Sequence, residues 1–205
     1  MTFKTFLTAL VLTLSVSAHA GFMAVANVSK IHGTAFLNKE KVKDGQEITE
    51  GMMISIPKKG DYIDVKFQNG HVVRMMGAAV MVKELNPKNT FFELLKGKLY
   101  SAVKPLTKDE KFQVKTRRAS FAVRGTHFFI EEGKKDSYLC VCEGVVNTKS
   151  TKGEVDVKKD EDLRITKPKD EPKATVAAQS MVDAAKAVFT DMGAQVQQSA
   201  EAQKQ

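Results

Sequence analysis

The chain has 205 residues, of which 42% are hydrophobic and 27% are charged, a balance that favours a folded soluble protein over a disordered one. It carries 32 Lys and Arg against 24 Asp and Glu, and the formal net charge of +8 predicts an attraction to acidic partners. A continuous apolar segment occurs only at the N-terminus, which excludes a membrane protein with several spans.

The N-terminus has the three parts of a secretory signal peptide. Lys4 supplies a positive charge, residues 6–16 form an apolar stretch of 11 residues, and the Ala-His-Ala sequence that ends at Ala20 fits the small-x-small rule for cleavage. The stretch is too short for a stable membrane span. We therefore predict a cleavable signal peptide over residues 1–20 and a mature chain that begins at Gly21. The mature chain is expected in the periplasm, or secreted, without a membrane span or a lipid anchor.

Residues 27–167 predict β structure. Ile63, Val65 and Phe67 alternate with polar residues, which places three apolar side chains on one face of a strand. The Asn-Gly pair at residues 69–70 follows directly, and such a pair between extended segments predicts a hairpin whose two turn residues both have positive φ. Strand–Gly–strand units recur at irregular spacing. We predict an all-β domain of strands stacked by short turns, in the manner of a β-solenoid or a flattened sandwich.

The chain changes character at residues 168–173, where two Pro and four charged residues predict a linker. Residues 174–205 are rich in Ala and Gln and predict one amphipathic helix, which Gly193 is expected to weaken by about 1 kcal/mol relative to Ala. We expect its apolar stripe to dock on the β domain or on a partner, and the chain to be a monomer, because the stripe has few of the Leu and Ile residues that pair helices. The stripe comprises Met181, Ala185, Val188, Met192 and Val196.

No pattern of catalytic or metal-binding residues is recognised. His32, His71 and His127 are far apart in the sequence, and there is no His-Glu-x-x-His motif, Gly-x-Ser-x-Gly elbow or glycine-rich phosphate loop. We therefore expect no enzyme activity, no cofactor and no metal. A hydrolase whose residues come from distant parts of the chain is kept as a minor alternative.

Cys140 and Cys142 form the one candidate redox pair. Residues two apart in a strand face the same side, so both thiols are expected opposite the core pair Leu139 and Val141. Three interpretations stay open: two small apolar fillers, which we favour, a strained or intermolecular disulfide, and a pair of metal ligands. An intrastrand disulfide would be strained because extended backbone holds the two Cα atoms about 6.6 Å apart, near the upper limit for a disulfide.

An ordered set of short motifs lies between residues 112 and 146. Phe-Gln-Val-Lys-Thr occupies residues 112–116, Val-Arg-Gly-Thr occupies residues 123–126, and Glu-Gly-Val-Val occupies residues 143–146. The predicted strand pairs upstream of residue 112 contain short motifs of the same kind. This order resembles the FecR protein domain family over roughly residues 30–165. The matching motif residues are Val123, Arg124, Gly125, Thr126, Phe128, Glu143 and Gly144.

The resemblance implies mainly a fold, an all-β domain. In well-known members of the family this domain follows a cytoplasmic anti-sigma segment and a membrane helix, and it senses a TonB-dependent receptor from the periplasm. The signal peptide predicted here departs from that pattern. The expectation is therefore a stand-alone exported FecR domain without direct anti-sigma action.

Within the motif we expect structural roles. Gly125 is expected to permit a close backbone approach, and Thr126 to bond local backbone groups. Arg124 is expected to pair with an acid or with turn carbonyls. A separate basic cluster is a candidate contact for an anionic partner, although such a cluster is usually a solvated face. It comprises Lys115, Arg117 and Arg118.

These observations favour a non-enzymatic binding or interaction module of the cell envelope. Its expected partner is an envelope protein or an anionic envelope polymer, and nucleic acid is not expected in that compartment. The alternative is a component of envelope or cell-surface signalling that contacts a separate transmembrane regulator or a TonB-dependent receptor.

Overall fold

The computed structural model describes residues 25–194. The predicted signal peptide with its cleavage site between Ala20 and Gly21, and the predicted helix beyond residue 194, lie outside the described residues. The elements are β1 (Ala26–His32), β2 (Phe36–Leu37), β3 (Glu40–Lys41), β4 (Glu47–Ile48), β5 (Met53–Ser55), β6 (Tyr62–Phe67), β7 (Val72–Leu85), β8 (Asn89–Ala102), β9 (Lys111–Lys115), β10 (Ser120–Val123), β11 (His127–Glu132), β12 (Ser137–Glu143), β13 (Val145–Lys149), β14 (Glu154–Lys158), β15 (Glu161–Ile165), β16 (Ala174–Val176) and α1 (Gln179–Asp191).

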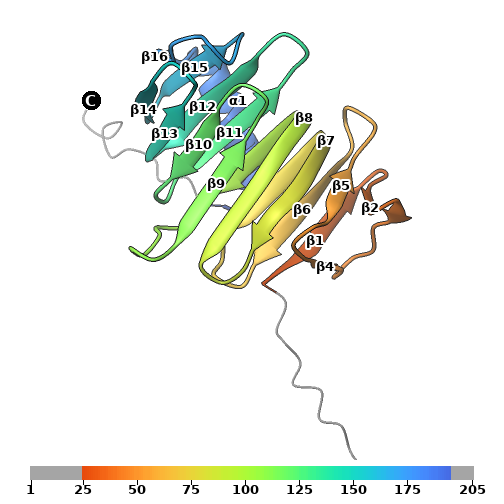
Figure 1. The fold of residues 1–205 in the computed structure, drawn as a ribbon. Helices are drawn as coiled ribbons and strands as arrows, with labels where there is room; N and C mark the ends of the chain where they lie inside the picture. Colours follow the sequence, from red (N-terminus) through yellow and green to blue (C-terminus); the bar gives the residue numbers. More distant parts are fainter. Residues whose placement is uncertain (1–24, 195–205) are drawn as a thin grey trace, which may run out of the picture.

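The described strands belong to one sheet that divides into two layers around the long hairpin β7–β8 (Figure 1). The first part of β7 pairs with β6 and its second part with β5, whereas the second part of β8 pairs with β11 and its first part with β9. One layer, whose outer face is covered by α1 and which we call the covered layer, has the strand order β4-β1-β6-β7-β8-β11-β12-β15-β16. The opposite layer, which we call the open layer, has the strand order β3-β2-β5-β7-β8-β9-β10-β13-β14. The pairing of β8 with β9 is parallel, and the other pairings are antiparallel.

Two glycines allow β7 and β8 to pass from one layer to the other. Gly77 and Gly97 have φ of 54° and 88°, and a Cβ at Gly97 would lie 2.3 Å from the carbonyl oxygen of Gly77. The register shifts at the same place, between Met76 and Ala79. A side chain at Gly97 would therefore push the two strands apart at the bend.

The main hydrophobic core lies between the two layers. Phe112 of β9 packs against Phe128 of β11, and Phe67 of β6 packs against Phe92 of β8, each pair with ring centroids 6.4 Å apart. Alternation along each strand supplies these inward side chains, as in β9, where Phe112 and Val114 are buried between exposed residues.

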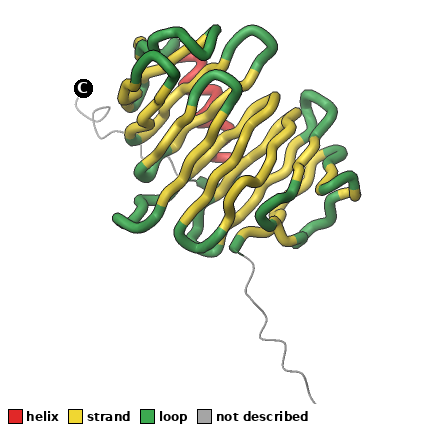
Figure 2. The backbone as a smooth tube through the Cα atoms, viewed as in Figure 1, coloured by secondary structure: helices red, strands yellow, loops and turns green. Residues whose placement is uncertain are grey.

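Helix α1 covers the outer face of the covered layer, where it lies behind the strands in Figures 1 and 2. Val182, Ala185 and Phe189 are buried there against a second apolar cluster that is separate from the main core. Its strand residues are Tyr100, Ala102, Phe129, Tyr138, Cys140 and Cys142. Within residues 25–194, no helix has the length and apolar character needed to cross a membrane.

The predicted all-β fold with a C-terminal helix is confirmed. The finer expectation of a β-solenoid finds no support in the pairings, since neighbouring strands form one divided and mainly antiparallel sheet. The Asn-Gly hairpin at residues 69–70 is present between β6 and β7, but Gly70 alone has positive φ there. Both turn residues have positive φ instead at Asn38 and Lys39, in the two-residue turn between β2 and β3.

The predicted helix bounds are wrong at the start. Ala174–Val176 forms a strand that pairs with β15, where the Thr175 hydroxyl donates to Asp162 at 2.6 Å, and the helix begins only at Gln179. Gly193 also has another role than predicted. Gly193 adopts a φ of 72° directly after the helix and terminates it, and the Ala194 N–H donates to the Phe189 carbonyl at 2.9 Å.

The buried stripe of α1 is also rotated from the predicted one. Val182, Ala185, Phe189 and Met192 are buried, whereas Met181 and Val188 are only partly buried at its margins. The spacing of three and four residues was the correct signal, but the prediction placed the stripe one residue off at two positions, Met181 for Val182 and Val188 for Phe189.

Candidate functional site: a groove beside the layer crossovers

The family-motif glycines lie where the chain crosses between the two layers. Gly125 joins β10 to β11 and has a φ of 87°, and a Cβ there would lie 2.6 Å from the Pro105 Cα. Gly144 joins β12 to β13 and has a φ of 82°, and a Cβ there would lie 2.6 Å from the Gly125 carbonyl oxygen. Three crossovers therefore stack closely, and only glycine fits at two of them.

The other motif residues divide between the core and the surface. Val123 and Phe128 are buried in the main core, whereas Arg124 is exposed and has no hydrogen bond or ion pair within residues 25–194. Thr126 is buried, but its hydroxyl has no hydrogen-bond partner, in contrast to the prediction. Its backbone carbonyl instead accepts from the Val103 N–H at 2.9 Å.

A groove of about 620 Å³ lies next to these crossovers, on the outer face of the covered layer. Its floor includes one row of paired residues across five strands, from β6 to β12. Its first wall is the end of α1, and the second is formed by the turns and crossovers near Gly70, Lys104 and Gly125. The floor row is Lys66, Val72, Ala102, His127 and Glu143.

Charged side chains stand at both ends of this row. Lys66 lies at one end, and the Lys104 ammonium lies close by over Gly70, where a Cβ would be only 2.5 Å from Nζ. At the other end, Nδ1 of His127 is 2.8 Å from Oε2 of Glu143. The groove is thus basic at one end and acidic at the other, with the small apolar residues Val72 and Ala102 between them.

The helix wall of the groove is anchored by an ion-pair network. Arg74 is buried and forms a two-pronged contact with Asp64, at 2.6 and 2.7 Å. Its remaining nitrogen contacts Asp191 of α1 at 2.7 Å, and Lys30 contacts the same carboxylate at 3.2 Å. Burial lowers the pKa of Arg74, but its hydrogen bonds to Asp64 and Asp191 outweigh that effect and raise the pKa overall.

The predicted basic cluster is largely occupied by internal contacts. Arg117 donates to Glu132 at 2.8 Å, and Arg118 donates to the same carboxylate and to the carbonyls of Thr166 and Lys134. The Glu132 side chain is fully buried. These arginines join the β9–β10 turn of the open layer to the β11–β12 turn of the covered layer. Of the three cluster residues, only Lys115 is exposed without a side-chain hydrogen bond or ion pair to the rest of residues 25–194.

The two cysteines lie as the strand alternation predicts. Leu139 and Val141 belong to the main core, whereas Cys140 and Cys142 are free and buried beneath α1. The interaction between the two neighbouring thiols lowers the pKa of Cys140 and raises that of Cys142, to which burial adds. Within residues 25–194, no group of three or more His, Cys, Asp or Glu side chains is placed to hold a metal ion.

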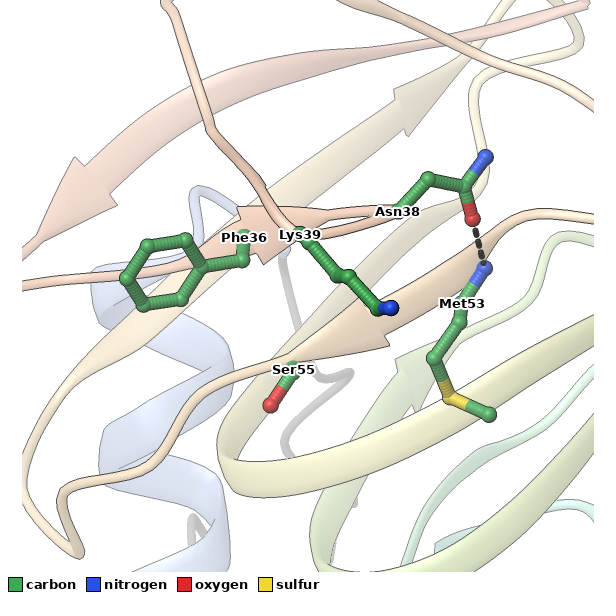
Figure 3. Close-up of a pocket in the computed structure, with 5 residues that line it drawn as sticks. All are labelled: Phe36, Asn38, Lys39, Met53 and Ser55. Carbon is green, nitrogen blue, oxygen red and sulfur yellow. Dashed lines mark hydrogen bonds between the residues drawn. The ribbon is translucent and has the colours of Figure 1, made fainter.

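A second hollow of about 610 Å³ lies at the edge of the open layer (Figure 3). It is formed around the β2–β3 turn and β5, where the Asn38 side chain accepts the Met53 N–H at 2.8 Å. Lys39 is its one charged side chain, so it offers fewer convergent polar groups than the groove. Its lining residues are Phe36, Asn38, Lys39, Met53 and Ser55.

Comparison with protein families matches residues 55–147 to the family described as FecR protein. Residues 55–147 are a FecR domain. The FecR domain contains the five residues of the groove floor and both motif glycines, whereas β1–β4 precede it and β14–β16 and α1 follow it. The resemblance found in the sequence is thereby confirmed over residues 55–147, a shorter range than the expected 30–165.

One solved structure shares the fold in part, and a second gives a weaker match. The first, from Parabacteroides distasonis ATCC 8503 and described as a "putative anti-sigma factor", has a TM-score of 0.55 and 19% sequence identity, and the match covers 64% of this chain and 63% of that one. A second structure with the same description and source has a TM-score of 0.44 and 16% identity, covering 67% of this chain and 61% of that one. This chain therefore spans less than two thirds of either. A comparison with curated proteins gives no match.

Sequence reasoning missed the groove, although it named some of its residues. It identified Gly125 and Glu143 as motif residues, but nothing in the sequence indicated that Lys66 and Lys104 border the same groove. That arrangement depends on the strand order β6-β7-β8-β11-β12, which places residues almost eighty positions apart in the sequence along one row of the sheet. Lys66 carried one usable signal, since its place in the alternation of β6 put it on the face away from the core.

Proposed function

We propose that this FecR-domain protein is an exported, non-enzymatic binding module of the cell envelope that contacts its partner at the groove. The observation that carries the proposal is the position of the groove, which lies beside the crossovers of the motif glycines, is lined by Gly125 and is bordered by Lys66, Lys104, His127 and Glu143. An open groove with a few convergent polar groups is the usual form of a binding site. The groove shows neither a nucleophile–base pair nor a candidate metal site, so binding accounts for it better than catalysis does.

A role in signalling is the alternative, and the comparison with the solved structure favours it. The fold shared with a protein described as a "putative anti-sigma factor", together with the FecR domain, supports a partner that is a transmembrane regulator or a TonB-dependent receptor. In this proposal the chain acts in the periplasm as a monomer, and its partner carries the signal across the membrane.

Affinity capture from envelope extracts tests both forms of the proposal. The mature chain is immobilised, captured proteins are identified by mass spectrometry, and retention of lipopolysaccharide and peptidoglycan fragments is measured at rising salt. A captured TonB-dependent receptor or transmembrane anti-sigma protein supports signalling, whereas salt-sensitive retention of polymer supports an anionic polymer as the partner.

Two charge-reversal variants connect the captured partner to the groove. Lys66→Glu/Lys104→Glu reverses the basic end of the groove, and Lys83→Glu/Lys111→Glu makes the same charge change at exposed strand positions of β7 and β9. We expect the first variant to lose the partner and the second to keep it. Equal capture by both variants and the unmodified chain would contradict binding at the groove.

A further inference from the structure

The shape of the groove suits an extended ligand. Its floor crosses the strands from Lys66 on β6 to Glu143 on β12, passing over β7, β8 and β11. Four strand-to-strand steps of about 4.8 Å make this path about 19 Å long. Extended peptide rises about 3.3 Å per residue, so about six residues separate the two ends of the path.

The charges along the path are asymmetric. Lys66 and Lys104 supply two ammonium groups at one end, and the Glu143 carboxylate stands at the other with His127 beside it. The Glu143 side chain is 31% exposed, and its contact to His127 engages one of its two oxygens. The second oxygen is the acceptor that this end of the groove offers to an incoming donor.

The middle of the path favours a peptide over a sugar chain. Val72, Ala102 and Met192 supply small or flexible apolar contacts, which match the alternate side chains of an extended peptide. Saccharides are commonly held against aromatic faces, but the single aromatic ring among the described residues that line the groove is that of His127. That ring is already packed edge-on against Phe189, with centroids 5.4 Å apart.

We propose that the groove binds an extended peptide segment of a partner protein that carries an acidic side chain and, six residues away, a basic one. The acidic side chain lies between Lys66 and Lys104, and the basic one reaches Glu143. A separation of six is specific because residues an even number apart share one face of an extended chain, so both charged side chains face the floor. This inference rests on the proposed function, in which the chain is a binding module.

Synthetic peptides test the spacing directly on the mature chain. We use fluorescein-labelled peptides of Ala, Ser and Thr that carry one Asp at position i and one Lys at position i+6, i+5 or i+3. A further peptide carries two Asp, at positions i and i+6. Fluorescence anisotropy is expected to give the tightest binding for the separation of six, with a loss of about threefold or more for each other peptide. Equal affinity for all separations overturns the proposal.

A double-mutant cycle assigns the basic end of the peptide to Glu143. Glu143→Gln keeps the size of the side chain and removes its charge, and a peptide with Gln in place of Lys removes the opposite charge. We expect each change alone to weaken binding about threefold, and both together to weaken it no further. Additive losses overturn the contact, and circular dichroism of Glu143→Gln establishes that the variant is folded.

The outcomes separate this inference from the proposed function. If no peptide binds while Lys66→Glu/Lys104→Glu still loses the partner captured from envelope extracts, the inference is wrong and the binding module stands. If the capture itself is insensitive to that variant, the proposed function fails as well. Salt-sensitive binding of an anionic lipopolysaccharide fragment in the groove, with no peptide binding, overturns the choice of a peptide.

Discussion

Gly51 and Gly125 have similar backbone conformations in different surroundings. Their φ values are 82° and 87°, but a Cβ at Gly51 meets nothing within 4 Å, whereas one at Gly125 would lie 2.6 Å from the Pro105 Cα. We expect Gly51→Ala to lower the free energy of unfolding by about 1 kcal/mol through backbone strain alone. Gly125→Ala should cost about 3 kcal/mol or more, because two crossovers must also move apart.

Urea unfolding of the two variants measures this difference. Gly51→Ala is the matched control, since it changes the same atoms at nearly the same φ. Equal losses of unfolding free energy in the two variants would show that glycine is needed at position 125 only for its positive φ. The stacking of the crossovers would then contribute nothing to stability.

His71 makes the stability of the protein depend on pH. The ring is buried among Phe67 and Phe112, and its Nδ1 accepts the Lys104 N–H at 3.1 Å. Burial lowers the pKa of His71 below its ordinary value of 6.5; the charge of Lys104 also lowers it, and that of Glu110 opposes the shift. The unfolded chain therefore takes up a proton at a higher pH than the folded chain does. Stability is complete above about pH 6.5 and decreases as the pH falls towards the folded pKa.

Urea unfolding at several values of pH between 7.5 and about 5 tests this prediction, with His71→Gln as the comparison. Gln keeps an acceptor for the Lys104 N–H but does not titrate, so the variant should lose less stability than the unmodified chain over that range. Identical slopes would assign the pH dependence to other groups.

At the scale of elements, Glu132 connects the two layers through their turns. Its buried carboxylate at the end of β11 accepts from Arg117 and Arg118, which follow β9, and from Ser137 at the start of β12. Glu132→Ala leaves two guanidinium groups without their counter-charge. The loss should be about 3 kcal/mol, below the largest values for buried pairs because the Arg117 side chain is 56% exposed.

The neighbouring Glu131 is the control for this variant. It lies on the same strand, 41% exposed, with its carboxylate 3.5 Å from the Lys98 ammonium. Glu131→Ala should cost less than about 1 kcal/mol in the same thermal or urea unfolding experiment. Similar losses for Glu131→Ala and Glu132→Ala would mean that the turns are held together by the strands alone.

The sequence predicted single strands well because alternation is local. Phe112 and Val114 could be placed on one face of their strand from five residues of sequence, and Cys140 and Cys142 on the face opposite the core pair. The division into layers was not predictable in this way. It depends on bends at Gly77 and Gly97, and the sequence alone does not distinguish a glycine at a bend from one in a turn.

The candidate site was predictable only in part, for a related reason. The family motif pointed to Gly125 and Glu143, but Arg117 and Arg118 looked like a free basic cluster, because their partner Glu132 is distant in the sequence and its burial is a property of the fold. The groove needed the strand order of the whole sheet. Charge runs are therefore weak evidence for a binding surface until their internal partners are known.

At the scale of the whole molecule, the two hydrophobic clusters make α1 separable from the β layers. The main core lies between the layers, whereas α1 contributes only to the cluster on the outer face. The helix has no side-chain cap at Ala178 and no acidic residue in its first turn, so its stability depends on that contact. A chain that ends at Ala177 should therefore keep its strand content in far-ultraviolet circular dichroism.

The same truncation tests the predicted monomer. With α1 present, Tyr100, Phe129 and Tyr138 are covered, and light scattering is expected to give the mass of one copy. Without residues 178–205 these aromatic side chains face water, so the truncated chain should associate as its concentration rises. Asp191→Asn is the milder comparison, because it weakens the contact of α1 to Arg74 and Lys30 while leaving its apolar side chains in place. A full chain that is a stable dimer and a truncated chain that is a monomer would reverse the assignment, since α1 would then join two copies.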